Sequence, residues 1–304
     1  MIKLDFVIIG GQKCGSTFLH TVINAHPEID MPSGECSHFE SPDYENNGLI
    51  KLEELLSDLN QNKKIGIKRP NYLSKPEVRE RITEVNEQIK LIVILRNPIE
   101  RLKSAYFHNM NYGFSPTLSL NTGIKKLIAG RLKKRYPRTD ELIEFGYYAK
   151  YLKDYIKDYG DRLLVLFYDD LKKDKLGIIK KCYSFLEVDA DFIPSDNFLN
   201  SKPQKVNYSL LRTRLLTKKN RFQFNYNATR TRLEVKKQNR IDKIICQTID
   251  RIDRRIVSKY LVEDKKPDFN SEILLQLIEI YKHDIKELES ICNVDLSHWM
   301  SFRA

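Results

Sequence analysis

FVIIGGQKCGST, residues 6–17, joins a run of apolar residues to a glycine-rich loop. The apolar part extends from Lys3 to Gly10 and has the length and composition of a buried parallel strand. After the loop, Thr17–Ala25 carries apolar residues at helical spacing and stops before Pro27. A strand, a tight turn and a helix in this order place backbone N–H groups at a helix N-terminus, where they bind anions. The segment therefore predicts a phosphate-binding loop in an α/β fold.

The position of the lysine separates this loop from the common nucleotide fingerprints. The loop is not G-x-G-x-x-G, and Lys13 precedes the last glycine, whereas the lysine of G-x-x-x-x-G-K-[ST] follows it. Lys13 supplies a positive charge, while Ser16 and Thr17 can cap the helix and donate to oxyanions. The alternative is an ordinary helix cap beside a lysine. We predict a phosphate loop that differs from that of the usual ATP sites.

A second loop follows the strongly apolar run KLIVIL at Lys90–Leu95. This run predicts a buried strand, and Pro98 then opens a helix that reaches about Met110. Arg96 stands at the strand end, where its planar guanidinium can grip a phosphate; a surface salt bridge is the alternative. Ser104 lies about two turns into the helix, so that it could meet the same phosphate from another direction.

The remaining apolar segments alternate between strand and helix patterns. Strands are predicted at Lys64–Lys68 and, as the fourth, at Leu163–Phe167. The predicted helices are Lys75–Gln88, Thr139–Tyr159, Leu171–Leu186 and Ser271–Ile291. This alternation predicts an α/β fold with a central parallel sheet flanked by helices. Ligands of such sheets bind beyond the carboxyl ends of the strands, where the two loops above lie.

Composition excludes several other classes of protein. Of 304 residues, 41% are hydrophobic and 31% charged, with only 12 Gly and 11 Pro, which excludes collagenous and disordered chains. No apolar run is long enough for a membrane span, and the first one lacks a signal-peptide pattern. The five cysteines are odd in number and lack C-x-x-C pairs, so reduced thiols are expected. We expect a cytoplasmic location.

The positive charge is concentrated in one part of the chain. Lys202–Tyr260 contains 17 Lys and Arg residues against four acidic ones, although the whole chain has a net charge of only +11. A solvated helical surface is one interpretation. The other is a surface for an anionic partner such as a nucleotide, an acidic glycan, nucleic acid or a membrane. We interpret residues 1–304 as a single domain in which residues 202–266 form a basic, helical insertion.

The two loops together resemble those of the sulfotransferases that use 3′-phosphoadenosine-5′-phosphosulfate (PAPS). Lys-Cys-Gly-Ser-Thr at residues 13–17 and L-R-N-P-x-x-R-x-x-S-x-Y at residues 95–106 carry the resemblance. Residues 65–73 and PEVRERI at residues 76–82 are similar to heparan sulfate glucosaminyl sulfotransferases. FGYY at 145–148, FYDDL at 167–171 and LSHW at 296–299 are similar to bacterial carbohydrate sulfotransferases.

The resemblance implies a P-loop-containing nucleotide-binding fold and a set of donor contacts. The 5′-phosphosulfate would be held by the residues of the first loop and its helix: Lys13, Gly15, Ser16, Thr17 and the backbone of Phe18. Arg96 and Ser104 would hold the 3′-phosphate, which distinguishes PAPS from ATP. Tyr208 would correspond to a tyrosine that contacts the nucleotide. The family requires no metal, and we expect none.

The reaction implied is in-line transfer of a sulfuryl group, with Lys13 and Lys68 stabilising the charge on the leaving phosphate oxygen. The relatives that modify glycans use a glutamate in a K-E-x-H-F-F-like segment as the base. Here the segment is GECSHFE, in which Glu35 keeps the carboxylate position while Gly34, Ser37 and His38 depart from the pattern. Glu35 is the predicted base and His38 is its rival.

The predicted acceptor is a hydroxyl or amine of a carbohydrate. The basic run at residues 131–136, together with the later basic stretch and the aromatic residues among these cations, suits an anionic polysaccharide, and a lipid-linked oligosaccharide is also compatible. We expect no nucleic-acid partner. Two other functions remain open from the residues: an ATP-dependent P-loop kinase, and a non-catalytic polyanion-binding protein that uses the basic stretch.

Overall fold

The computed structural model of the protein describes residues 2–200, 206–227, 229–260 and 266–301. Their contacts divide them into two compact units. Unit 1 comprises the described residues within 1–101, 147–204 and 282–304. Unit 2 comprises those within 102–146 and 205–281. Of the predicted basic insertion, residues 202–205 and 261–265 lie outside the described residues.

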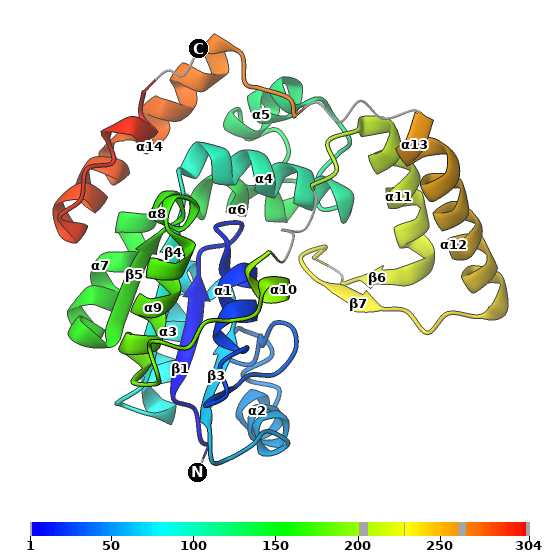
Figure 1. Cartoon of the computed structure of the whole chain (residues 1–304). Helices are drawn as coiled ribbons and strands as arrows, with labels where there is room; N and C mark the ends of the chain where they lie inside the picture. Colours follow the sequence, from blue (N-terminus) through cyan, green and yellow to red (C-terminus); the bar gives the residue numbers. More distant parts are fainter. Residues whose placement is uncertain (1, 201–205, 228, 261–265, 302–304) are drawn as a thin grey trace. The chain divides into compact units, whose positions relative to one another are not determined.

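Unit 1 is built on a five-stranded sheet in the order β2-β3-β1-β4-β5, with every neighbouring pair parallel (Figure 1). The strands are β1 (Phe6–Gly10), β2 (Ile29–Asp30), β3 (Lys64–Lys68), β4 (Lys90–Leu95) and β5 (Leu163–Phe167). After β1 the chain forms β2 and β3 on one side of β1 and then crosses to β4 on its other side. Since loops diverge at such a reversal of strand order, the carboxyl ends of β1 and β4 flank the expected ligand crevice.

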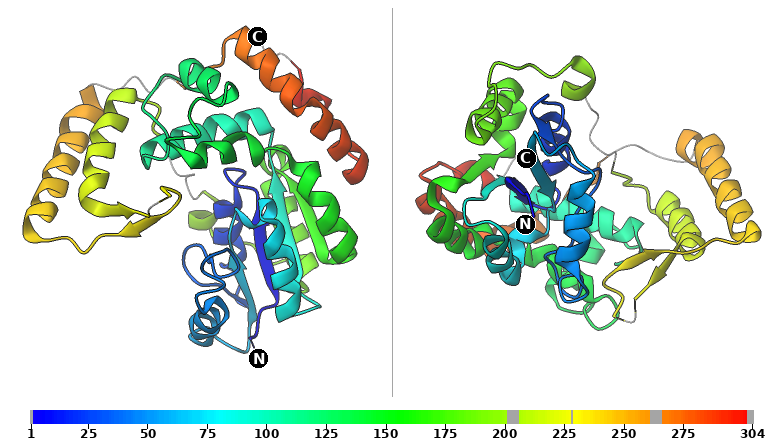
Figure 2. Two further views of the ribbon diagram at one scale, coloured as in Figure 1. Left: turned by 180° about the vertical axis from the view of Figure 1, so that it is seen from behind. Right: turned by 90° about the horizontal axis from the view of Figure 1, so that it is seen from below.

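Helices cover both faces of this sheet (Figures 1 and 2). On one face, α1 (Ser16–Ile23) packs against α9 (Lys175–Leu186). On the other, α7 (Tyr148–Tyr159) contacts β4 and β5 and the short helix η1 (Tyr72–Ser74) that leads into α3 (Pro76–Val85). The remaining elements of unit 1 are α2 (Gly48–Ser57), η3 (Gly160–Arg162), α8 (Tyr168–Lys173), α10 (Asp196–Leu199) and η5 (Ser297–Trp299).

The central strands are buried on both faces, as their nearly continuous apolar sequences require. All five residues of β1 are buried, and so are the last five of β4. Phe6 of β1 pairs in register with Gly66 of β3, and a Cβ at Gly66 would collide with the Phe6 ring. Glycine at this position of β3 thus makes room for an aromatic side chain within the layer.

Unit 2 contains two regions of sequence that are far apart. The first holds the later part of α4 (Pro98–Asn111), followed by α5 (Leu120–Ile128), η2 (Pro137–Thr139) and α6 (Asp140–Glu144). The second, which is the basic stretch, holds α11 (Leu210–Gln223), the antiparallel hairpin β6 (Phe224–Tyr226) and β7 (Leu233–Val235), α12 (Arg240–Ile252), the π-helical turn η4 (Asp253–Val257) and α13 (Ser258–Tyr260). The first residues of α14 (Ser271–Cys292) also belong to unit 2.

The four predicted strands are confirmed, as are the fold class and the starts of the helices after β1 and β4. Two helix predictions are wrong because each joins two helices into one. The predicted helix Thr139–Tyr159 is interrupted between α6 and α7, and Asp284 of α14 accepts the N–H groups of Ala149 and Lys150 at the start of α7 (3.1 and 3.0 Å). The predicted helix Leu171–Leu186 is divided at Asp174, whose side chain caps α9 by accepting from the Gly177 N–H.

The sequence predicted neither β2, which has two residues, nor the β6–β7 hairpin. Such short strands carry little periodic signal. Among the described helices, none is both long and apolar enough to cross a membrane.

Candidate functional site

The loop after β1 is fixed to the neighbouring strand and ends in a left-handed turn. The Gly11 N–H donates to the carbonyl of Ile94 in β4 (2.7 Å). Lys13 and Gly15 have φ angles of 64° and 108°, both in the left-handed region. At Gly15 a Cβ would also come within 3.1 Å of the Tyr168 ring, so a side chain there would be both strained and crowded. Glycine thus lets the backbone turn sharply into α1.

The first turn of α1 carries the polar groups that the sequence singled out. Ser16 is buried and Thr17 is exposed, and their N–H groups lie where a helix supplies no acceptor of its own. The Phe18 N–H already donates to the Gly15 carbonyl (2.9 Å). The positive end of the helix dipole and the side chain of Lys13, which precedes it in the loop, make this end of α1 suitable for an anionic group.

Arg96, directly after β4, contacts this loop. Its Nη1 donates to the Lys13 carbonyl (3.4 Å), and its guanidinium lies over the Tyr168 ring, 4.9 Å from the centroid. Its Nη2 reaches Glu100 at 3.4 Å. The Tyr148 hydroxyl donates to the Arg96 carbonyl (2.8 Å) and lies 3.5 Å from Cys14 Sγ. The structure therefore brings the two predicted loops together at the carboxyl ends of β1 and β4.

The surroundings of the Lys13 side chain disfavour its positive charge. Burial lowers the pKa of Lys13 below its ordinary value, and the nearby positive charge of Arg96 lowers it further, although the Glu35 carboxylate acts in the opposite direction. Two cations that share a partly desolvated site repel each other, and a bound anion relieves that repulsion. The electrostatics of the two loops thus favour a ligand with negative charge.

Lys68, the last residue of β3, extends the cationic site on the other side of β1. It is only 5% exposed, and burial lowers its pKa. Its Nζ donates to the hydroxyl of Thr17 (3.4 Å) and lies 3.9 Å from Glu35 Oε1. The structure therefore links two of the predicted catalytic residues, Lys68 and Glu35, to the first turn of α1.

Arg69 and Glu40 hold Glu35 in place, and the sequence did not single out either residue. Arg69 donates to both carboxylate oxygens of Glu40 (2.6 and 2.9 Å) and to Glu35 Oε2 (3.0 Å). Burial alone would lower the pKa of Arg69, but its hydrogen bond with Glu40 and the charges of both glutamates raise it. The local backbone is fixed as well, since the Cys36 N–H donates to the Lys68 carbonyl (3.0 Å). We call this set of Glu35, Glu40 and Arg69 the Arg69 clamp.

His38 and His20 lie in different surroundings. Burial lowers the pKa of His38, and the charges that act on it are those of Asp43 and Lys51. Burial also lowers the pKa of His20, but there the charges that act on it are Lys68 and Glu35. His20 Nε2 lies 3.0 Å from the Pro32 carbonyl and thus joins α1 to the segment that carries Glu35. His20 is therefore a neighbour of the site.

Two predicted donor contacts belong to unit 2. Ser104 is buried on α4, at 8% exposure. Tyr208 packs edge to face on Phe107, with ring centroids 5.0 Å apart. Asn97, between β4 and α4, caps that helix by accepting the Ile99 N–H (2.9 Å).

The cysteines are free thiols, as expected. Cys14 is fully buried, and burial raises the pKa of its thiol in spite of the neighbouring helix N-terminus. A raised pKa keeps a thiol protonated and inert, so Cys14 has a packing role. Within the described ranges, no group of three or more His, Cys, Asp or Glu side chains is arranged to hold a metal ion.

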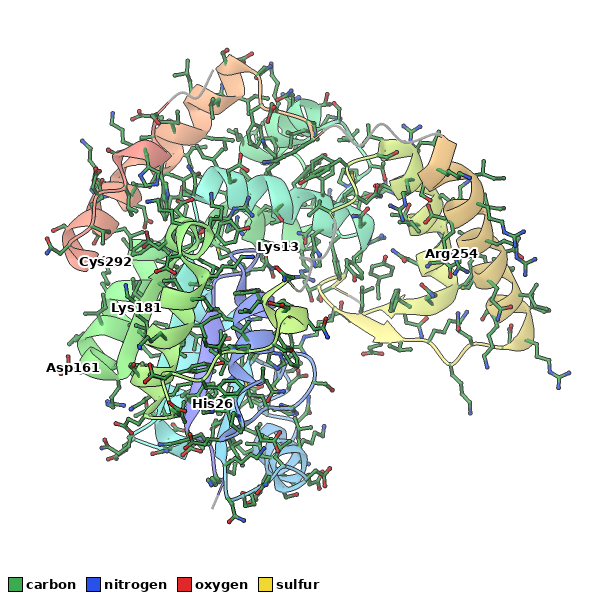
Figure 3. All side chains as sticks on the ribbon, in the orientation of Figure 1. Lys13, His26, Asp161, Lys181, Arg254 and Cys292 are labelled. Atoms are coloured by element: carbon green, nitrogen blue, oxygen red, sulfur yellow. The ribbon has the colours of Figure 1, made fainter. Side chains whose placement is uncertain are left out.

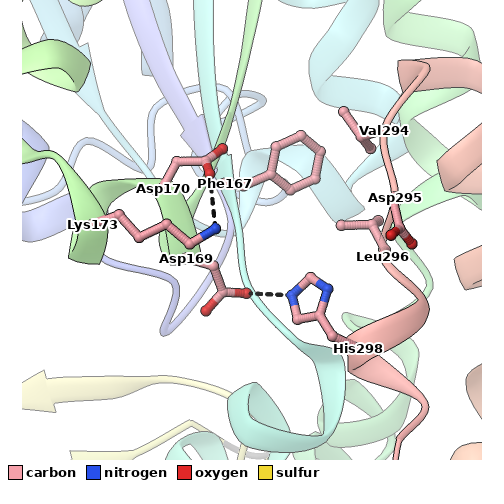
Figure 4. Close-up of a pocket in the computed structure, with 8 residues that line it drawn as sticks. All are labelled: Phe167, Asp169, Asp170, Lys173, Val294, Asp295, Leu296 and His298. Carbon is pink, nitrogen blue, oxygen red and sulfur yellow. Dashed lines mark hydrogen bonds and ion pairs between the residues drawn. The ribbon is translucent and has the colours of Figure 1, made fainter.

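A pocket of about 210 Å³ lies at the carboxyl end of β5. Figure 4 shows Asp169 facing His298 and Asp170 facing Lys173, at 3.2 and 3.9 Å. Neither Lys13 nor Arg96 is among the residues that line it. This pocket is therefore separate from the site that the two loops form.

Comparisons with known proteins agree on one family. The model of the sulfotransferase domain matches residues 3–289. The membrane-associated sulfotransferase kil1 of Dictyostelium discoideum is 34% identical over 112 residues, which make up 36% of this chain and 23% of that protein. Human heparan sulfate glucosamine 3-O-sulfotransferase 3B1 is 27% identical over 182 residues, 59% of this chain and 45% of that enzyme. The chain thus spans less than half the length of these relatives.

A solved structure covers the whole fold. The crystal structure of a sulfotransferase from Alicyclobacillus acidocaldarius aligns with 99% of this chain and 100% of its own, with a TM-score of 0.66 and 19% sequence identity. At this level of identity the likeness establishes a shared fold.

Proposed function

The chain belongs to the sulfotransferase family, and on that premise we propose that it transfers a sulfuryl group from PAPS to a hydroxyl or amine of a carbohydrate. The observation that supports this most directly is the meeting of Lys13 and Arg96 in two loops at the carboxyl ends of β1 and β4. PAPS carries anionic groups at both its 5′ and 3′ positions. Two cationic loops at one crevice are suited to a donor of that kind.

The described residues of the first loop fit the 5′-phosphosulfate. Gly15 allows the left-handed turn into α1, while the N–H groups of Ser16 and Thr17 and the ammonium group of Lys13 supply donors and positive charge. Arg96 is proposed to bind the 3′-phosphate, because a guanidinium fork matches the geometry of phosphate oxygens. Ser104 and Tyr208 remain predicted contacts from the resemblance.

The transfer step needs charge stabilisation and a base. The acceptor oxygen or nitrogen forms a bond to sulfur while the bond from sulfur to the bridging phosphate oxygen breaks, so that adenosine 3′,5′-bisphosphate leaves with the bonding electrons. Lys13 and Lys68 are proposed to stabilise the negative charge that develops on that oxygen. Glu35 is proposed to accept the proton that the acceptor loses.

The contacts of Glu35 support its assignment as the base over His38. The Glu35 carboxylate lies 3.9 Å from Lys68 Nζ, which in turn contacts Thr17 of the donor loop. Its side chain is 42% exposed, so an acceptor can reach it. The charges that act on His38 are instead those of Asp43 and Lys51.

A carbohydrate acceptor is supported by the relatives, because the human enzyme named above is a heparan sulfate glucosamine sulfotransferase. Among carbohydrates we propose an anionic polysaccharide, since unit 2 carries the basic run at residues 131–136, in which four of six residues are Arg or Lys. A neutral glucan would gain nothing from that charge.

The proposal is tested by incubating the full chain with sulfur-labelled PAPS and either an unsulfated heparan-type polysaccharide or a neutral glucan. We expect label in the anionic polysaccharide, and its loss in Lys13→Ala and Glu35→Gln proteins. Lys180→Ala is the matched control, because Lys180 is an exposed lysine on α9 whose side chain pairs with the exposed Asp191 (2.6 Å). Transfer of phosphate from ATP, or no transfer of label to any acceptor, would contradict the proposal.

A further inference from the structure

The outer face of α12 and η4 exposes a row of isoleucines. Ile241, Ile244, Ile252 and Ile256 are 67%, 61%, 39% and 50% exposed. Their spacing of three, eight and four residues places them along one side of a continuous helix. Single exposed apolar side chains are common on proteins, but four in line on one element are a feature to explain.

The opposite face of α12 and η4 packs against α11 within unit 2. Asp242, Cys246, Asp253 and Val257 are all buried, and both α12 and η4 contact α11, which lies beside them in Figure 1. The helix therefore needs none of the four exposed isoleucines for this packing.

The acidic residues of α12 and η4 are paired with basic residues elsewhere in unit 2. Asp253 forms two hydrogen bonds with Arg212 of α11 (2.8 and 2.9 Å). Asp250 binds Lys219, also of α11, at 2.7 Å, and Asp242 lies 3.2 Å from Lys236. No other acidic residue occurs between Arg240 and Val257.

The Arg and Lys side chains of α12 and η4, in contrast, face outward. Five of them are exposed: Arg240, Lys243, Arg251, Arg254 and Arg255. Figure 3 labels Arg254 among these side chains. We use the name α12 face for these five bases together with Ile241, Ile244, Ile252 and Ile256. It presents apolar side chains and positive charge, and no carboxylate.

We propose that the α12 face binds the surface of an anionic lipid bilayer, with the helix lying in the plane of the membrane. Isoleucines reach the boundary between headgroups and acyl chains, while the Arg and Lys side chains meet lipid phosphates. An anionic bilayer matches the α12 face better than a polysaccharide or nucleic acid does, because those polyanions offer no apolar phase for four isoleucines. Membrane binding by this face does not depend on the proposed sulfuryl transfer.

The test is co-sedimentation of the full chain with vesicles of phosphatidylcholine alone or of phosphatidylcholine with about one third phosphatidylserine. We expect binding to the anionic vesicles, weakened by high salt, and little binding to the neutral ones. An Ile241→Ser/Ile244→Ser protein should lose at least about tenfold in vesicle affinity with an unchanged melting temperature, since transfer of each apolar side chain contributes to binding. Arg251→Glu/Arg255→Glu should lose binding as well.

The matched control is Ile50→Ser/Ile193→Ser, because these isoleucines are similarly exposed, at 57% and 66%, but lie outside the α12 face. The control should bind vesicles as the unchanged protein does. Four results would overturn the proposal. The first two are no binding to anionic vesicles, and binding that the Ile241→Ser/Ile244→Ser change leaves unaltered. The third is a lowered melting temperature in that variant, which would mean that the protein itself covers the face. The fourth is self-association that only that variant loses, which would assign the face to a second copy.

Discussion

At the scale of single residues, the candidate base is defined by the cations around it. Glu35 lies between Lys68 and Arg69, at 3.9 and 3.0 Å. Lys68 in turn contacts the first turn of α1 through Thr17. The Glu35 carboxylate thus lies near the first turn of α1, and Arg69 binds one of its oxygens.

Replacing this carboxylate tests its role directly. We expect Glu35→Gln to lower kcat by about 10²–10⁴-fold, the usual contribution of a general base. Affinity for adenosine 3′,5′-bisphosphate should stay within about threefold, since the amide keeps the shape of the side chain. Steady-state kinetics and calorimetry measure the two quantities. His38→Gln serves as the comparison and should keep most of the activity; the reverse pattern would assign the base to His38.

Lys13 gives the site a pH dependence. Burial lowers the pKa of Lys13 below 10.5, so the ammonium group loses its proton at a lower pH than an ordinary lysine does. Affinity for the bisphosphate should therefore be full at neutral pH and should fall as the pH rises through that lowered pKa. Lys13→Arg should remove the alkaline decline, because a guanidinium stays charged. Calorimetric dissociation constants between about pH 7 and 10 measure this, and identical profiles for both proteins would refute the role of Lys13.

At the scale of elements, the Arg69 clamp connects the end of β3 to the segment that carries Glu35. Glu40 is 5% exposed and binds Arg69 through both of its oxygens. The Tyr72 hydroxyl in η1 donates to the Cys36 carbonyl and accepts the Phe39 N–H. The position of the candidate base thus depends on contacts made by Arg69, Glu40 and Tyr72.

Glu40→Gln should therefore affect both folding and turnover. Losing one partner of a buried, charged hydrogen bond should reduce the free energy of unfolding by about 1–3 kcal/mol. It should also lower kcat, because Arg69 no longer holds Glu35 in one position, while donor affinity remains. Urea unfolding and steady-state kinetics measure the two effects. Unchanged turnover in a destabilised protein would show that the clamp is purely structural.

The sequence predicted the elements that carry local signals. KLIVIL gave β4 with its bounds, and Pro98 marked the start of α4. It did not predict the break between α6 and α7, because the group that caps α7 is Asp284, some 135 residues away in the chain. The sequence did not predict the Arg69 clamp for the same reason, since its residues meet only after β3 and the Glu35 segment pack together. The break at Asp174, in contrast, was predictable, because Asp174 caps α9 through Gly177, only three residues away in the sequence.

At the scale of the whole molecule, a segment near the C-terminus returns to unit 1 and joins two strand ends. Trp299 is buried, and its Nε1 donates to Asp169 just after β5 (2.8 Å). Its carbonyl accepts from Asn97, which follows β4 (3.2 Å). Asp169 also accepts from His298 (3.2 Å) and pairs with Lys172 (2.8 Å). These contacts fasten the segment after α14 to the edge of the sheet that carries the site.

Asp169→Asn should weaken this attachment. Burial opposes ionisation, but hydrogen bonds from Lys172, Trp299 and His298 lower the pKa of Asp169 from 3.8 to about 2. The lowered pKa stabilises the fold above pH 3.8, and this contribution disappears as the pH falls toward about 2. After allowance for solvent screening, we expect a loss of about 1 kcal/mol at neutral pH.

Urea unfolding of both proteins across that pH range measures the effect of Asp169→Asn. The difference in unfolding free energy should be present at neutral pH and should shrink below pH 3.8. A difference that persists unchanged at pH 2 would assign it to packing and not to the charge of Asp169.

The arrangement of unit 1 followed from the alternation of strand and helix patterns, which implies a parallel sheet with its ligand at the carboxyl ends. The division of the described residues into two units did not follow, because unit 2 combines residues within 102–146 with residues within 205–281. Charge drew attention to the basic stretch, but which residues face outward depends on its packing against α11.

The central claim is that the loops after β1 and β4 form a site for the sulfate donor. Calorimetric titration with adenosine 3′,5′-bisphosphate, beside ATP and without added metal, tests it most directly. We predict tight binding of the bisphosphate, weak binding of ATP, and loss of bisphosphate binding in both Lys13→Ala and Arg96→Ala proteins. Equal affinity for both nucleotides, or binding that survives both substitutions, would contradict the assignment of these two loops as the donor site.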